Sequence, residues 1–112
     1  MLAFLSEEEL DEYLLHHELK RRTPNTITDA EKLRAELRGT RLRGCAIDNE
    51  EFEEGLKCVG VPVRDHTGNV VAGLGIAGLV SRLRSARTEI VTKSVINAAA
   101  ELSVVLGYRQ AD

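Results

Sequence analysis

The chain has 112 residues, of which 43% are hydrophobic and 29% charged, proportions typical of one globular domain. Its formal net charge of −3 opposes a nucleic-acid-binding surface, which needs clustered Lys and Arg to neutralise phosphates. The two cysteines suggest reduced thiols, and no apolar run approaches the roughly 18 residues of a membrane span, so we expect a single cytoplasmic domain over residues 1–112.

The first helical pattern covers residues 2–20. Ser6 and Glu9 have the spacing of a capping box, and apolar residues recur at helical spacing after them. The apolar residues 2–5 precede this cap, and we interpret them as the tail of an earlier helix. The basic residues 20–22 are expected to close the helix, where its dipole favours positive charge.

A second helix is predicted to begin at a capping-box pattern that starts with Thr28. It is predicted to end at either Gly39 or Gly44. Residues 45–47 follow as an apolar run that is too short for a helix and is expected to be a strand. Five carboxylates then lie between residues 48 and 54. They lack the glycine spacing of a calcium loop, so we interpret the four glutamates as the solvated side of a bend. Asp48 differs, because it directly follows the strand.

Residues 56–63 alternate with β-branched side chains and predict a second strand, in which Pro62 indicates an edge position or a neighbouring bulge. Residues 65–69 have the composition of a hairpin turn. Residues 70–79 form the third predicted strand, and the glycines within it indicate a bulge or the close approach of a backbone or ligand. They match the letters G-x-G-x-x-G, but a dinucleotide site requires them in a turn that opens a helix.

The last predicted helix begins at Ser85 as its cap and ends before Gly107. Its apolar positions, expected to lie across the sheet, are Val91, Val95, Ala98, Leu102 and Val105. Three arginines at its start, Arg82, Arg84 and Arg87, gain nothing from the helix dipole. A carboxylate partner is expected for them, and the acidic bend is the candidate source.

No motif of a known catalytic site is present, so we do not expect an enzyme or a cofactor. No ligand spacing recurs among the histidines, cysteines and acidic residues, and no metal site is predicted. Cys58 could act as a nucleophile only beside a histidine in an electropositive environment. Its neighbours in the sequence are apolar, which favours an inert buried thiol.

The stretch from Ile47 to Cys58, with its acidic filling and its Gly-Leu-Lys-Cys ending, resembles the effector-binding domain of the IclR family of bacterial transcriptional regulators. Residues 26–29, the helix around 33–37 and the later strands fit the same pattern. The resemblance implies a GAF-like α/β fold, an antiparallel sheet flanked by helices in the order α-α-β-β-β-α. It also implies a small-molecule effector, an organic acid or an aromatic compound, and a homo-oligomer that reaches DNA only through a separate N-terminal domain outside these residues.

The resemblance also assigns five effector-binding residues. Asp48 matches the pocket aspartate of the family, Cys58 the pocket cysteine and Leu56 an apolar wall position. Gly75 and Ala77 fall where members that bind small oxoacids often carry hydroxyl groups. Their absence implies a larger or less polar effector, or a pocket without a ligand.

We therefore expect an effector-binding and oligomerisation domain of a regulator, represented here by part of its effector domain. One alternative is a self-association module that binds no ligand. Another is a hydrolase that uses Cys58, which the apolar neighbours of this residue disfavour.

Overall fold

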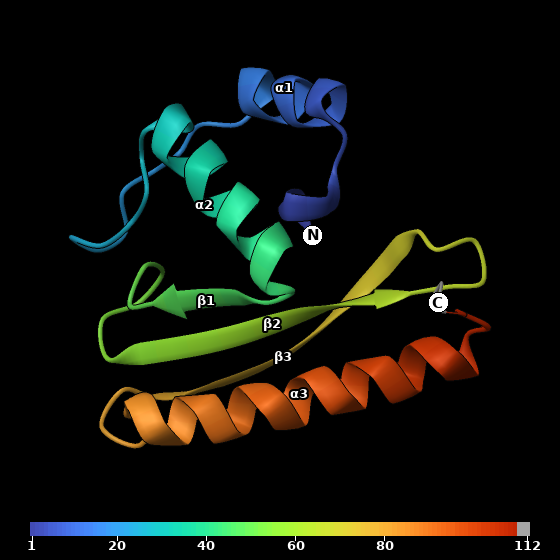
Figure 1. Cartoon of the computed structure of the whole chain (residues 1–112). Coiled ribbons are helices and arrows are strands. Elements are labelled where there is room, and N and C mark those ends of the chain that lie inside the picture. The colour runs from blue at the N-terminus through green and yellow to red at the C-terminus, as the bar shows by residue number, and fades with distance from the viewer. Residues whose placement is uncertain (110–112) are drawn as a thin grey trace.

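A computed structural model of the chain describes residues 1–109, which form a mixed α/β fold with a three-stranded antiparallel sheet. Figure 1 shows α3 along one face of the sheet, with α1 and α2 on the other side. The elements in chain order are η1 (Leu2–Phe4, a 3₁₀ turn), α1 (Glu7–His16), α2 (Ala30–Arg43), β1 (Ala46–Asn49), β2 (Leu56–Arg64), β3 (Val70–Leu79) and α3 (Ser85–Val105). The predicted class and the order α-α-β-β-β-α are confirmed.

Helix α1 has the predicted capping box, in which the Ser6 side chain accepts from the Glu9 amide and the Glu9 carboxylate accepts from the Ser6 amide. The helix ends at His16 and not at residue 20. The His17 ring stacks on Tyr13 with centroids 4.1 Å apart, and its Nδ1 lies 2.9 Å from the Tyr13 carbonyl oxygen. That carbonyl is thus satisfied by a side chain at the helix end. Residues 20–22 lie outside the helix, so their predicted role was wrong.

Helix α2 is capped by Asp29, whose carboxylate accepts from the Glu31 amide at 2.9 Å, and not by Thr28. It ends at Gly44, the second of the two predicted positions, where φ is 78°. Residues 2–5 are a single turn held against this helix: the Arg41 side chain donates to the carbonyl oxygen of Ala3 at 2.7 Å and to that of Leu5 at 2.9 Å.

The strand order is β1-β2-β3, so β2 is the central strand, and the edge position that was one of the two possibilities for Pro62 does not hold for the strand as a whole. Proline is tolerated here because pairing with β1 stops at Gly60, and Pro62 lies beyond it. A register shift between Val63 and Arg64 also places an irregularity beside it, which was the other predicted possibility. The hairpin turn is confirmed, with Gly68 at φ 83°.

Helix α3 packs on one face of the sheet, mainly against β2. The core between them consists of Cys45, Val61, Val63, Val95 and Ala99, with Leu74 and Val91 packed against it. The predicted apolar face was only partly right, because Ala98, Leu102 and Val105 are exposed. Ala99 and Ser103 are buried instead. Ser103 tolerates burial because its hydroxyl donates to the Ala99 carbonyl at 2.8 Å and accepts from the Arg64 amide at 3.0 Å.

The start of α3 also differs from the prediction. Ser85 is the first helical residue, and the residue at the cap position, Arg84, makes no side-chain capping bond. None of the three arginines around this end forms an ion pair within residues 1–109, so a carboxylate partner is not found there. The helix ends as predicted before Gly107, whose φ is 90°.

Candidate functional site

One row of side chains crosses all three strands on the sheet face opposite α3. Asp48 on β1 lies opposite Cys58 on β2, and Cys58 lies opposite Ala77 on β3. Directly opposite side chains in antiparallel strands are about 5 Å apart, so the carboxylate and the thiol are neighbours. The two polar residues singled out in the sequence are thus brought together by strand register.

A second row runs beside the first. It consists of Ala46, Gly60 and Gly75, which also lie opposite one another across the strands. Each is two residues away from a member of the first row, and side chains two apart share one face of a strand. Because these residues are small, they leave space above the sheet.

A pocket of about 420 Å³ occupies this space. Its lining residues are Met1, Ala46, Asp48, Cys58, Val59, Gly60, Gly73, Leu74, Gly75, Ile76 and Ala77. Four of the five residues named from the sequence belong to this lining. The fifth, Leu56, does not: it begins β2 opposite Leu79, and its carbonyl accepts from the Glu50 amide at 3.1 Å.

Asp48 offers the pocket a hydrogen-bond acceptor. One of its carboxylate oxygens accepts from the Glu51 amide at 2.8 Å, which fixes the side chain, and the other has no hydrogen-bond partner within the described residues. Burial raises the pKa of the Cys58 thiol, and the negative charge of Asp48 raises it further. Cys58 is therefore a neutral thiol at pH 7. No Lys or Arg side chain lines the pocket.

The acidic bend is more ordered than the sequence indicated. The Glu50 carboxylate accepts from the Gly55 amide at 2.8 Å, and Glu50 itself has a φ of 59°. Glu51 is half-buried, and this burial raises the pKa of its carboxyl, with a smaller contribution from Asp48. The solvated interpretation holds for Glu53 and its neighbour 54, which are exposed, and not for the first two glutamates.

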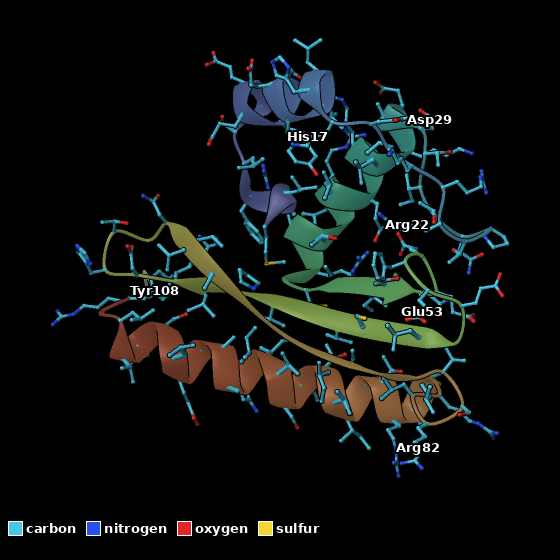
Figure 2. All side chains as sticks on the ribbon, turned by 180° about the vertical axis from the view of Figure 1, so that it is seen from behind. His17, Arg22, Asp29, Glu53, Arg82 and Tyr108 are labelled. Carbon is cyan, nitrogen blue, oxygen red and sulfur yellow. The ribbon has the colours of Figure 1, made fainter. Side chains whose placement is uncertain are left out.

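A second pocket, of about 460 Å³, lies on the other side of Asp48, between α2, β1 and the segment around residues 18–27. Figure 2 shows Arg22 above the end of the sheet at which the bend with Glu53 lies. The Arg22 guanidinium carbon is 5.1 Å from the centre of the Phe52 ring, and the Thr26 hydroxyl donates to the Glu51 carbonyl. These contacts tie the segment after α1 to the bend that positions Asp48.

Several lining residues were not identified from the sequence. Ala46 and Gly60 stand two positions from Asp48 and Cys58, so the two-residue period of a strand would have indicated both. Met1 and Gly73 could not be found in that way. The Met1 side chain lies beside Gly73, with its Cγ 3.5 Å from the position that a Cβ at Gly73 would occupy.

The part of the chain that the structure describes contains no cluster of three His, Cys, Asp or Glu side chains able to hold a metal ion. Nor does any helix within residues 1–109 have the length and apolar character needed to cross a membrane.

Comparisons with known proteins agree with this architecture. A family model described as bacterial transcriptional regulator IclR C-terminal matches residues 1–104. The HTH-type transcriptional regulator XynR of Escherichia coli is 37% identical over 108 residues, which are 96% of this chain and 43% of XynR. The crystal structure of Thermotoga maritima IclR has a TM-score of 0.90 and 48% identity, covering 96% of this chain and 43% of that chain.

A third similar structure was determined with a bound ligand. It is a double mutant of the PobR inducer-binding domain from Acinetobacter in complex with 3-hydroxybenzoic acid, with a TM-score of 0.85 and 30% identity over 91% of this chain and 59% of that chain. This chain spans about two fifths of the length of the curated relatives it matches, and those relatives are transcriptional regulators, not enzymes. The chain belongs to the IclR family of bacterial transcriptional regulators, and its residues 1–104 match the C-terminal domain of that family.

Proposed function

We propose that this chain is the small-molecule effector-binding and self-associating domain of an IclR-type regulator that works in the cytoplasm. In this proposal, effector binding changes how a DNA-binding module outside these 112 residues engages DNA. The observation that carries the proposal is the row of Asp48, Cys58 and Ala77, which brings a carboxylate and a thiol together over a floor of small residues in one pocket.

The pocket favours a ligand that donates a hydrogen bond. The free oxygen of Asp48 accepts, and no Lys or Arg side chain of the lining compensates a second negative charge. A hydroxylated organic acid fits when its hydroxyl donates to Asp48 and its carboxylate stays at the open side, because like charges repel. Its apolar body then lies on Gly75 and Ala77. The ligand of the PobR domain, 3-hydroxybenzoic acid, combines a hydroxyl group with such a body and is a suitable probe.

The test compares 3-hydroxybenzoate with benzoate by calorimetry and thermal unfolding. A hydrogen bond to a charged group contributes about 1.5–3 kcal/mol, so the hydroxylated compound is expected to bind at least about tenfold more tightly. Asp48→Asn replaces the free oxygen with an amide NH₂ while its remaining oxygen still accepts from Glu51. This variant is expected to lose the preference for the hydroxyl. Glu53→Gln, which removes a charge from the same bend outside the pocket, is the matched control and should bind like the wild type.

A panel of other hydroxylated acids and aromatic compounds extends the test if neither probe binds. The proposal fails if no compound of the panel raises the melting temperature of the wild type, since a ligand that binds only the folded state must stabilise it. It also fails if Asp48→Asn retains the full preference for the hydroxyl.

One observation favours a second candidate, a self-association module without a ligand. The outer side of β3 has no strand partner within residues 1–109 and is apolar. A mass that rises with protein concentration, together with no response to the ligand panel, would select this candidate over the first.

A further inference from the structure

A groove of about 360 Å³ lies beside β2, beyond Gly60, the last residue of this strand that pairs with β1. Its walls come from η1, α2, β2 and α3. It shares no lining residue with the pocket that contains Asp48 and Cys58. Pockets that bind small molecules have volumes of about 300 Å³ or more and are mostly apolar, with a few polar groups. The groove is therefore a separate candidate site.

The backbone along this groove is poorly suited to an added strand. Pro62 has no amide hydrogen, and the Arg64 amide donates to the Ser103 hydroxyl at 3.0 Å. Both features weaken pairing with another chain, because an added strand needs free donors along the edge. A small molecule is thus the more suitable occupant.

Two guanidinium groups lie at the η1 end of the groove. The guanidinium carbon of Arg64 is 5.1 Å from the centre of the Phe4 ring. The Arg41 side chain donates to the carbonyl oxygens of Ala3 and Leu5, which flank Phe4. Neither arginine forms an ion pair within residues 1–109, and no Asp or Glu lines the groove. An anion bound here would compensate two like charges.

Arg64 is held in place with donors to spare. Its Nη1 donates to the Gly68 carbonyl at 2.8 Å, whereas its Nε and Nη2 have no hydrogen-bond partner within the described residues. These two nitrogens form one edge of the guanidinium, which can donate to both oxygens of a carboxylate. The adjacent carboxylate of Asp65 is engaged in the hairpin turn, where it accepts from the Thr67 amide at 2.9 Å.

The wall formed by α3 is apolar. Ile96, Ala100 and Val104 follow one another at four-residue spacing, so they form a stripe along one side of the helix that is about 12 Å long. Tyr108 adds a half-buried aromatic ring, and its amide donates to the Ser103 carbonyl at 2.9 Å. Figure 2 shows Tyr108 at the end of the molecule where α3 finishes and the hairpin joins β2 to β3.

We propose that this groove is a second ligand site, which takes a small aliphatic monocarboxylate. The carboxylate accepts from Arg64, and the chain lies along the apolar stripe of α3. This inference goes beyond the proposed function and does not depend on it. The two sites have opposite charge preferences: the pocket offers the Asp48 acceptor and no cation, whereas the groove offers two cations and no carboxylate.

Calorimetry with octanoate and with its neutral analogue octanol tests the site. Octanoate is expected to bind at least about tenfold more tightly, because hydrogen bonds to a charged acceptor are the stronger ones. Arg64→Gln removes the charge and should weaken octanoate binding at least about tenfold. Arg87→Gln is the matched control: it removes an exposed positive charge from α3, about 24 Å along the helix from Ser103, and should bind like the wild type.

A second variant leaves the contacts of Arg64 in place. Ala100 is exposed on α3, so Ala100→Glu should fold normally while its carboxylate repels octanoate from the groove. Its affinity for octanoate should also fall at least about tenfold, and its binding of 3-hydroxybenzoate should not change. The proposal is overturned if octanoate does not bind, if octanol binds equally well, or if Ala100→Glu retains full affinity. Octanoate binding that Asp48→Asn abolishes would also overturn it, since the ligand would then occupy the other pocket.

Discussion

The two faces of the sheet differ in the size of their side chains, and the alternation along the central strand β2 shows the difference. Val59, Val61 and Val63 of β2 point toward α3 and are 1%, 4% and 1% exposed. The alternate residues Cys58 and Gly60 point to the other face, are only half-buried and line the pocket. One strand therefore supplies large side chains for stability and small ones for binding.

This division follows from the physics of each face. Burial of branched apolar side chains against Val95 and Ala99 is the main favourable contribution to folding. Small residues such as Gly60 and Gly75 bury little area, so the pocket face contributes less to stability and retains the volume that a ligand needs. Substitutions on the two faces of the same strand should accordingly have different consequences.

The largest expected difference is between Val63→Ala and Cys58→Ala. Val63 is 1% exposed, and removing two buried methyl groups with incomplete collapse of the cavity should lower the free energy of unfolding by about 2–3 kcal/mol. Cys58 lies in the open pocket, so its truncation should cost less than about 1 kcal/mol. Urea denaturation measures both. Equal losses for the two variants would contradict the division between the faces.

A second comparison concerns Gly60 and Gly75, which lie opposite one another on the pocket face but differ in the space around them. A Cβ at Gly75 would lie 2.9 Å from the Val59 carbonyl oxygen, whereas one at Gly60 would have no atom within 4 Å. Gly75→Ala should therefore destabilise by about 1–2 kcal/mol, because overpacking outweighs the gain in backbone entropy. Gly60→Ala should be neutral or stabilise by up to about 1 kcal/mol. The midpoints of thermal unfolding would show this order, and a stable Gly75→Ala together with an unstable Gly60→Ala would refute it.

The same contact explains the departure from the family pattern at position 75. The sequence indicated only that a hydroxyl-bearing residue is missing there. In the structure, any side chain at Gly75 meets the backbone of β2. The backbone of this chain therefore disfavours a side chain at position 75, which the local sequence could not show.

Elements with strong local signals could be predicted from the sequence. The capping box at Ser6, the hairpin turn at Gly68 and the bounds of β3 each depend on residues that are close in the sequence. The failures involve contacts between distant segments. The central strand tolerates Pro62 because its pairing with β1 ends at Gly60, and Ser103 is buried because its hydroxyl accepts from the Arg64 amide. Neither partner is visible in the local pattern.

The candidate site, too, could be predicted from the sequence only in part. Asp48 and Cys58 were singled out from the sequence, but their placement side by side depends on the register between β1 and β2. The partial burial of Glu51 was missed, because it arises from residues around 22–26 that fold over the bend. A run of carboxylates alone does not show which of its members face the protein.

The partial burial of Glu51 makes stability depend on pH. Burial raises the pKa of its carboxyl above the ordinary value of 4.5, although the Asn49 amide opposes the shift. The protonated form is therefore favoured in the folded state, and this contribution is full below about pH 4.5 and is lost as the pH rises through the folded pKa. Glu51→Gln should gain stability relative to the wild type over that window. Denaturation in urea from pH 4 to pH 7 measures the gain.

The control for this prediction is Glu54→Gln, which removes an exposed carboxylate from the same bend. Its difference from the wild type should not change in the same direction with pH. If the two variants had the same pH profile, the carboxyl of Glu51 would be as solvated as that of Glu54, and the bend would be open on the side of Asp48.

The smallest expected effect concerns the reactivity of Cys58. Burial and then the charge of Asp48 raise the pKa of its thiol above the ordinary value of 9.0, so alkylation by iodoacetamide should become fast only at higher pH than for a free thiol. Asp48→Asn removes the charge and should move the pH profile of alkylation downward. Cys45 is buried at 5% exposure and should react more slowly, and Cys45→Ala removes its contribution altogether.

Glu53→Gln again serves as the matched control, because it removes one charge from the bend without touching the row that contains Cys58. Its alkylation profile should match that of the wild type. A shift in Asp48→Asn alone requires the carboxylate and the thiol to be neighbours in solution, as the register of β1 and β2 places them. Equal profiles for both variants would mean that Asp48 does not share the pocket with Cys58, and the ligand proposed for that pocket would lose its acceptor.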